Sequence, residues 1–156
     1  GYASLANGGT RVEPTLLRRT NVEVGPRVIS EAVSARTVSM LRQVVVRGTA
    51  SFGDVEGYEV GGKTGTADKP RAAGGGYYDD KVISTFASVF PASDPKYVLI
   101  VTLDEPTETS GSEPRRTAGW TAVPVAAEMI RRMAPLLGLR PQVDTPQQVS
   151  VTLTSN

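Results

Sequence analysis

The sequence predicts an α+β fold, in which a small antiparallel sheet is covered by helices. Three segments have the apolar content and alternation typical of strands, namely 58–67, 82–90 and 97–103. The last two are separated by only six residues, which include Pro91 and Pro95, so they are expected to form an antiparallel hairpin. Because both of these strands are apolar on both faces, helices must cover both sides of the sheet.

Two helices are expected to provide that cover. Residues 31–47 carry apolar side chains at helical spacing and follow Ser30, which can cap the helix N-terminus. The second helix is expected at 122–134, with Pro135 as its stop. Its sheet-facing stripe is expected to consist of Val125, Met129, Ile130 and Met133.

The remaining segments are interpreted as ends and loops. Residues 1–6 resemble the last turns of a helix that the Asn-Gly-Gly at 7–9 stops, so we expect the chain to be the C-terminal part of a longer protein. We expect residues 1–140 to form the folded portion and 141–156 a polar, frayed tail. The segments expected to be loops are 10–29, 49–57, 68–81 and 105–119. The third is expected to be mobile, because it contains a proline and three consecutive glycines.

Composition excludes several classes of function. Lys and Arg total 17 and Asp and Glu total 16, and this net charge of +1 gives no reason to expect nucleic acid as a partner. The sequence contains no histidine and no cysteine, which excludes a Ser-His-Asp triad, a thiolate nucleophile and any His- or Cys-ligated metal. We expect no metal site and no cofactor.

The most informative motif is Lys63-Thr64-Gly65-Thr66, in the first predicted strand. Side chains alternate along a strand, so Thr64 and Thr66 share one face, and Lys63 and Gly65 share the other. Two hydroxyls about 7 Å apart can hold one carboxylate together, and the lysine adds positive potential. The backbone N–H groups of the strand remain available for a second oxyanion.

A phosphate-binding loop is the remote alternative, because residues 57–64 satisfy the pattern G-x-x-x-x-G-K-[ST] of P-loop NTPases. A P-loop follows a buried strand and opens a helix whose N-terminus holds the phosphates. Here Gly65 follows the motif at once and Pro70 comes soon after, which leaves no room for that helix. The predicted hairpin also disagrees with the parallel βαβ unit of a P-loop fold.

A second false lead is Ser93-Asp94-Pro95-Lys96, which matches the S-x-x-K motif of serine acyltransferases. That chemistry needs the serine and the lysine on one helical turn, so that the amine can take the hydroxyl proton. Pro95 stands between them in a predicted hairpin turn, so we predict no nucleophile at this position. No other serine has a lysine three residues later, and no S-x-N occurs.

The string at 63–65 resembles the third motif, K-T-G, of the penicillin-recognising serine acyltransferases. Over most of residues 1–140 the chain resembles the C-terminal part of the transpeptidase domain of a class B penicillin-binding protein. The segments that carry this resemblance are 2–9, 28–30 with the following helix, 61–67, 86–92 and 104–106. The Asp-Glu-Pro at 104–106 is more similar to the septal, division-specific branch. Ala118-Gly119-Trp120 stands where that branch often has Gly-Gly.

The resemblance implies the serine β-lactamase/transpeptidase-like fold and a peptidoglycan D,D-transpeptidase that β-lactams inhibit. A serine upstream of this chain would attack the D-Ala-D-Ala end of a stem peptide, and an amine from a neighbouring stem would resolve the acyl-enzyme. Lys63 would support the S-x-N serine, and Thr64 and Thr66 would hold the terminal carboxylate along the strand that Gly65 leaves bare. The Thr66 N–H would contribute to the oxyanion hole.

The implied partners are the stem peptide, β-lactam antibiotics, the missing N-terminal part of the same protein and division-machinery proteins. The implied location is the periplasmic face of the bacterial inner membrane, with an anchor in a segment absent from this chain. This polypeptide alone is predicted to be inactive. A serine β-lactamase or D,D-carboxypeptidase of the same fold stays open as an alternative, as does a noncatalytic β-lactam-sensing domain.

Overall fold

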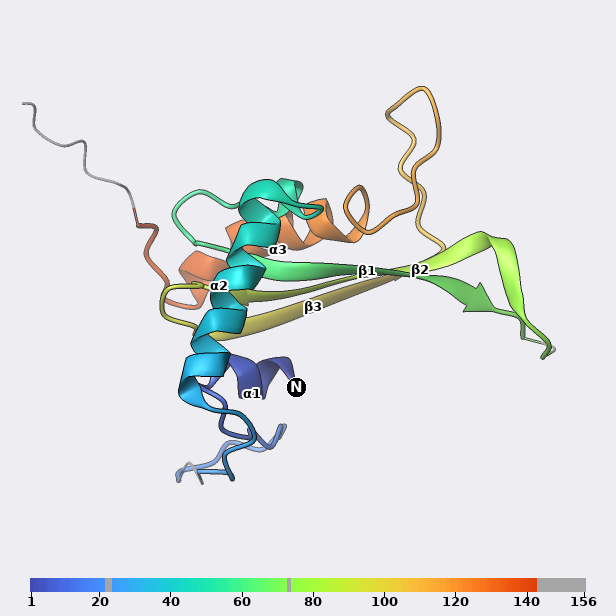
Figure 1. The fold of residues 1–156 in the computed structure, drawn as a ribbon. Coiled ribbons are helices and arrows are strands. Elements are labelled where there is room, and N and C mark those ends of the chain that lie inside the picture. Colours follow the sequence, from blue (N-terminus) through green and yellow to red (C-terminus); the bar gives the residue numbers. More distant parts are fainter. Residues whose placement is uncertain (22–23, 73, 143–156) are drawn as a thin grey trace, which may run out of the picture.

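The computed structural model describes residues 1–21, 24–72 and 74–142, in which helices pack on both faces of a three-stranded sheet (Figure 1). The helices and strands are α1 (Tyr2–Ala6), α2 (Glu31–Arg47), the 3-10 turn η1 (Ser51–Gly53), β1 (Gly61–Pro70), β2 (Tyr77–Phe90), β3 (Tyr97–Asp104) and α3 (Ala122–Leu136). The predicted α+β class and the antiparallel hairpin of the last two strands are both confirmed.

The sheet has the order β1-β2-β3, and both pairings are antiparallel. Lys63 lies opposite Ala87 and Thr64 opposite Phe86, while Phe86 lies opposite Val101 on the other side. β2 is therefore the central strand, and β1 is an edge strand along its whole length in the part of the chain that the structure describes. This position leaves one side of the K-T-G strand without a strand partner.

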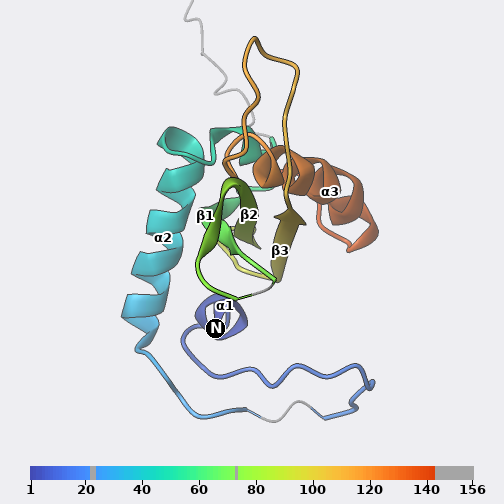
Figure 2. The same cartoon turned by 90° about the vertical axis from the view of Figure 1, so that its right-hand side faces the viewer.

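The two faces of the sheet are covered by different helices, as Figure 2 shows with α2 and α3 on opposite sides. Val38 and Leu41 of α2 pack on Val89, together with side chains of α1. On the other face, Phe86 and Phe90 belong to the larger core, which α3 closes. Buried apolar side chains on both faces fix the strand register, since a shift by one residue would exchange the faces.

The first strand and the following loop differ from their predicted bounds. Residues 58–60 are not in the sheet, although Tyr58 and Val60 are buried in the core, and β1 runs to Pro70 instead of ending at 67. The segment 68–81, predicted as a mobile loop, instead forms the far end of the β1–β2 hairpin, with 68–70 in β1 and 77–81 in β2. Backbone pairing to β1 outweighs the polar composition there, because a ladder needs only N–H and C=O groups.

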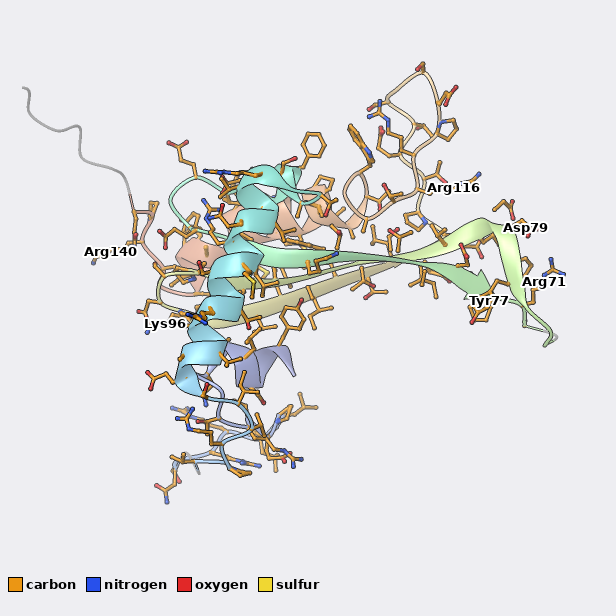
Figure 3. All side chains as sticks on the ribbon, viewed as in Figure 1. Arg71, Tyr77, Asp79, Lys96, Arg116 and Arg140 are labelled. Carbon is orange, nitrogen blue, oxygen red and sulfur yellow. The ribbon has the colours of Figure 1, made fainter. Side chains whose placement is uncertain are left out.

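Three glycines turn the chain at the end of this hairpin, with φ angles of +79° at Gly74, +80° at Gly75 and +90° at Gly76. Side chains are disfavoured at such angles, so the triple glycine marks a turn and not an extended loop. The hairpin projects well beyond the helices in Figure 1. Figure 3 labels Arg71 and Tyr77 near its far end, where the Arg71 guanidinium donates to the Tyr77 carbonyl.

The helices confirm their predicted positions but not every packing detail. Ser30 caps α2, with its Oγ accepting from the Val33 N–H at 3.2 Å, as expected. α3 continues to Leu136, so Pro135 lies inside its last turn and does not stop it at 134. The predicted stripe of α3 is wrong at Val125 and Met129, which are exposed, whereas Ile130 is buried and Met133 is half-buried. The buried residues of α3 are Ala122, Val123, Ala126, Ala127, Ile130 and Ala134. Small side chains let this helix approach the aromatic face of the sheet closely.

Candidate substrate-binding site

Successive residues of the K-T-G strand direct their backbone N–H and C=O groups alternately to β2 and to the open edge of the sheet. The hydrogen bonds between β2 and β3 show which residues direct these groups to the open edge. The Glu105 N–H donates to the Val82 carbonyl and the Lys96 N–H to the Phe90 carbonyl. Even-numbered residues of β2 therefore direct their backbone groups to β3, and odd-numbered ones direct theirs to β1. In the observed register, Thr64 and Thr66 lie opposite even-numbered residues, Phe86 and Ser84. Their N–H and C=O groups consequently point to the open edge of the sheet.

The side chains of the motif lie on the two faces as alternation predicts. A Cβ added at Gly61 would meet the Arg42 backbone of α2, whereas one added at Gly62 would meet the Phe86 ring of the other face. Lys63 and Gly65 thus share the α2 face, and Thr64 and Thr66 share the face that α3 covers. The Lys63 amine returns to the open edge, where Nζ donates to the Thr64 carbonyl at 2.7 Å. A cation and outward-facing backbone groups therefore meet at one edge.

The two threonine hydroxyls open into a groove of about 420 Å³. Its walls come from three segments, which are residues 48–52 after α2, Thr64 and Thr66 on β1, and residues 117–120 before α3. Thr49 Oγ1 lies 2.8 Å from Thr64 Oγ1, and the Ala118 N–H donates to Thr66 Oγ1 at 3.0 Å. Hydroxyls held in this way can still donate to an acceptor in the groove.

The outer wall of the groove is aromatic. The rings of Phe52 and Trp120 lie 5.0 Å apart, and the Arg115 guanidinium lies 3.8 Å from the Trp120 ring centre. This contact is short enough for a cation–π interaction, which places a second positive charge near the groove. The lining therefore combines hydroxyls, aromatic surface and positive charge, which suits a carboxylate on a partly apolar molecule.

The sequence predicts the β1 residues of this site but not Thr49, Phe52, Ala118 and Trp120. They lie in segments predicted as loops, or directly after one, and contribute a hydroxyl, two rings and a backbone amide that no motif marks. Only the close approach of residues 49–52 to 117–120 assigns them to the groove. The one available signal was Ala118-Gly119-Trp120, noted as a departure from the septal pattern.

Both alternative motifs fail in the structure. Residues 61–70 form a strand, so no helix begins at Thr64 and the P-loop interpretation is excluded. Ser93 lies in the turn after β2, where it bonds to the Glu59 carboxylate, while the Lys96 amine pairs with Asp94. Ser93 and Lys96 therefore form no nucleophile–base pair.

A cluster of charges ties the hairpin to the end of β3. Lys69 Nζ lies 2.7 Å from Asp104 Oδ2 and 2.7 Å from Glu105 Oε1, and Lys81 Nζ lies 3.0 Å from Glu105 Oε2. The hydrogen bond to Asp104, followed by that to Glu105, raises the pKa of the Lys69 amine. Hydrogen bonds from Lys69 and Lys81 lower the pKa of the Glu105 carboxyl. These charges are engaged with one another, so Lys69 and Lys81 do not serve the K-T-G edge, where the Lys63 amine lies.

Within residues 1–21, 24–72 and 74–142, no group of three or more acidic side chains is arranged to hold a metal ion. None of the helices described is long and apolar enough to cross a membrane.

Comparison with known proteins identifies the class to which this fold and this strand belong. The model of the penicillin binding protein transpeptidase domain matches residues 1–129. The probable peptidoglycan D,D-transpeptidase FtsI of Caulobacter vibrioides is 38% identical over 147 residues, covering 88% of this chain and 25% of that protein. Penicillin-binding protein PbpB of Mycolicibacterium smegmatis is 35% identical over 148 residues, covering 84% of this chain and 23% of the relative.

Solved structures agree with the sequence relatives. The transpeptidase domain of Burkholderia pseudomallei penicillin-binding protein 3 superposes with a TM-score of 0.77 at 30% identity, covering 91% of this chain and 42% of that one. Penicillin-binding protein 3 of Mycobacterium tuberculosis, complexed with ampicillin, gives 0.75 at 29% identity, covering 99% of this chain and 37% of that one. The chain spans about a quarter of the length of the curated relatives named above.

The chain belongs to the penicillin-binding protein transpeptidase family, and its similarity to FtsI and PbpB places it in the class B branch. The resemblance and the fold predicted from the sequence are both confirmed by these matches.

Proposed function

We propose that the native protein containing this chain cross-links peptidoglycan as a serine D,D-transpeptidase, and that this chain supplies the wall of the site that binds the acyl donor. The observation that carries the proposal is the open edge of β1, where the Thr64 and Thr66 backbone faces outward beside two hydroxyls and the Lys63 amine. An extended peptide can lie along such an edge as an additional strand.

Each residue of the motif has a distinct role in this proposal. Thr64 and Thr66 donate their hydroxyl protons to the terminal carboxylate of a D-Ala-D-Ala stem peptide or of a β-lactam. The Thr66 N–H, directed at the open edge, donates to the oxyanion that forms when the serine attacks. Lys63 stabilises negative charge and the serine of an S-x-N motif, and a side chain at Gly65 would contact only the Thr85 carbonyl oxygen, at 4.0 Å.

The nucleophilic serine comes from outside residues 1–156, because the only S-x-x-K in the sequence is the Ser93 turn. We therefore expect no acylation of this polypeptide alone by a fluorescent penicillin, and strong labelling of the native protein that contains it. Labelling of the isolated chain would contradict the assignment.

We also propose a cellular location and partner proteins for the native protein. The septal-type relatives support a site on the periplasmic face of the inner membrane, with a membrane anchor outside this chain and division-machinery proteins as partners. The transpeptidase domain is proposed to include residues 1–140. The tail predicted at 141–156 falls almost entirely outside the described residues.

The function is tested with Thr66→Val in the native protein. Removing one hydroxyl donor to a carboxylate is expected to lower the rate of penicillin acylation roughly 10- to 100-fold. A stem peptide ending in D-Ala-D-Ala, supplied with an acceptor amine, should yield the cross-linked product. Release of D-Ala by hydrolysis alone would indicate a carboxypeptidase, and unchanged acylation of the Thr66 variant would contradict the proposed carboxylate site.

A further inference from the structure

Both hydroxyls of the K-T-G strand have a hydrogen-bond partner that comes from outside the strand. Thr49 Oγ1 lies 2.8 Å from Thr64 Oγ1, and the Ala118 N–H lies 3.0 Å from Thr66 Oγ1. Thr49 follows α2, whereas Ala118 precedes α3, so two distant parts of the sequence converge on the same two side chains. Both contacts lie in the groove described above.

The chemistry of a hydroxyl determines which group donates and which accepts in these two hydrogen bonds. A threonine hydroxyl carries one proton and two lone pairs, whereas a backbone amide can only donate. Thr66 therefore accepts from Ala118 and keeps its own proton for another acceptor. A carboxylate can only accept, so Thr64 must also donate to it, and Thr49 must then donate to Thr64.

The two supporting segments are held against each other by close packing. A Cβ added at Gly119 would lie 2.6 Å from the Thr49 carbonyl oxygen, so only glycine allows this approach. Next to it, the Phe52 and Trp120 rings are in contact at 5.0 Å between centres. The packing of these two segments against each other therefore fixes the positions of Thr49 and Ala118.

We propose that Thr49 is a positioning residue for carboxylate recognition, orienting the Thr64 hydroxyl as a donor while the Ala118 amide does the same for Thr66. The proposal rests on the function proposed above for Thr64 and Thr66. Thr49 does not touch the reacting atoms; it fixes in advance the proton direction that the ligand needs. Such preorganisation reduces the cost of ordering the site when the ligand binds.

The test is Thr49→Val in the native protein, with Thr49→Ser as the conservative variant. The acylation rate constant is measured with a penicillin and with the methyl ester of the same penicillin, each relative to the unmodified protein. Loss of one orienting hydrogen bond is expected to slow acylation by the penicillin roughly 3- to 10-fold. The ester, which has no carboxylate, should react at an unchanged relative rate, and Thr49→Ser should restore the penicillin rate.

Thr102→Val is the matched control, because Thr102 and Thr85 form a similar hydroxyl pair at 3.1 Å on the opposite face of the sheet. It removes the same kind of bond and should leave acylation unchanged. Equal slowing of penicillin and ester by Thr49→Val, or no slowing of either, overturns the proposal.

Thr64→Val separates the two hypotheses. If this variant slows penicillin acylation and Thr49→Val does not, the positioning role is wrong and the carboxylate site stands. If Thr64→Val has no effect either, the proposed carboxylate site itself is wrong. Gly119→Ala, which pushes the two segments apart, should reproduce the penicillin-specific loss, and an unchanged rate in that variant would also contradict the positioning role.

Discussion

The packing behind the K-T-G motif predicts that Gly62→Ala destabilises the protein. The new Cβ would lie 2.5 Å from Phe86 Cζ, 2.6 Å from Phe86 Cε2 and 2.7 Å from the Ala87 carbonyl oxygen. Phe86 is completely buried, so its ring cannot move into solvent to relieve the contact. Either the ring or the β1 backbone must shift.

The size of the effect follows from the cost of overpacking. Inserting a methyl into a close-packed core typically costs about 1–3 kcal/mol. Each kcal/mol lowers the melting temperature by about 2–4 °C in a domain of 150–250 residues, and by less in a larger domain. Circular dichroism of the native protein during heating would measure this shift.

Gly65→Ala is the matched control, since it makes the same substitution three residues further along the strand. The nearest atom to its added Cβ is the Thr85 carbonyl oxygen at 4.0 Å, an ordinary contact, so the change in stability should stay within about 0.5 kcal/mol. Equal destabilisation by the two variants would show that glycine is needed for backbone conformation and not for packing. An unchanged melting temperature for Gly62→Ala would refute the packing argument altogether.

Two further predictions concern the segment after β3. Ser84 is fully buried, and its hydroxyl donates to the Arg116 carbonyl at 2.7 Å. Ser84→Ala leaves that carbonyl unpaired and should lower the free energy of unfolding, measured by thermal unfolding, by about 1–3 kcal/mol. An unchanged stability would mean that the carbonyl finds another donor. Hydrogen bonds from Lys69 and Lys81 lower the pKa of the Glu105 carboxyl in the folded protein. The ionised carboxylate therefore stabilises the fold at pH values above the pKa of an unfolded glutamate. This stabilisation is lost as the pH falls through the pKa of Glu105 in the folded protein. Glu105→Gln should therefore lower the melting temperature at neutral pH, and this difference should shrink toward acidic pH; a difference that persists in acid would contradict the ionic origin.

The sequence predicted the elements whose signals are local. Ser30 and Gly48 bound α2 as expected, because capping depends on side chains within one turn. The alternation of Lys63, Thr64, Gly65 and Thr66 between two faces followed from strand geometry alone. The prediction for 68–81 failed, because polar composition does not report whether a partner strand is available for pairing.

The sequence by itself determined the fold class, the order of the strands along the chain and the family. The signals for these, namely the strand motif, the helix caps and the apolar alternation, depend only on residues that are close in the sequence. Tertiary structure alone decided which edge of β1 is open, which residues of α3 are buried, and that Thr49 and Ala118 meet the two threonines. Those facts depend on contacts between segments that are far apart in the chain, and such contacts are fixed by packing and register, which leave no pattern within a single segment.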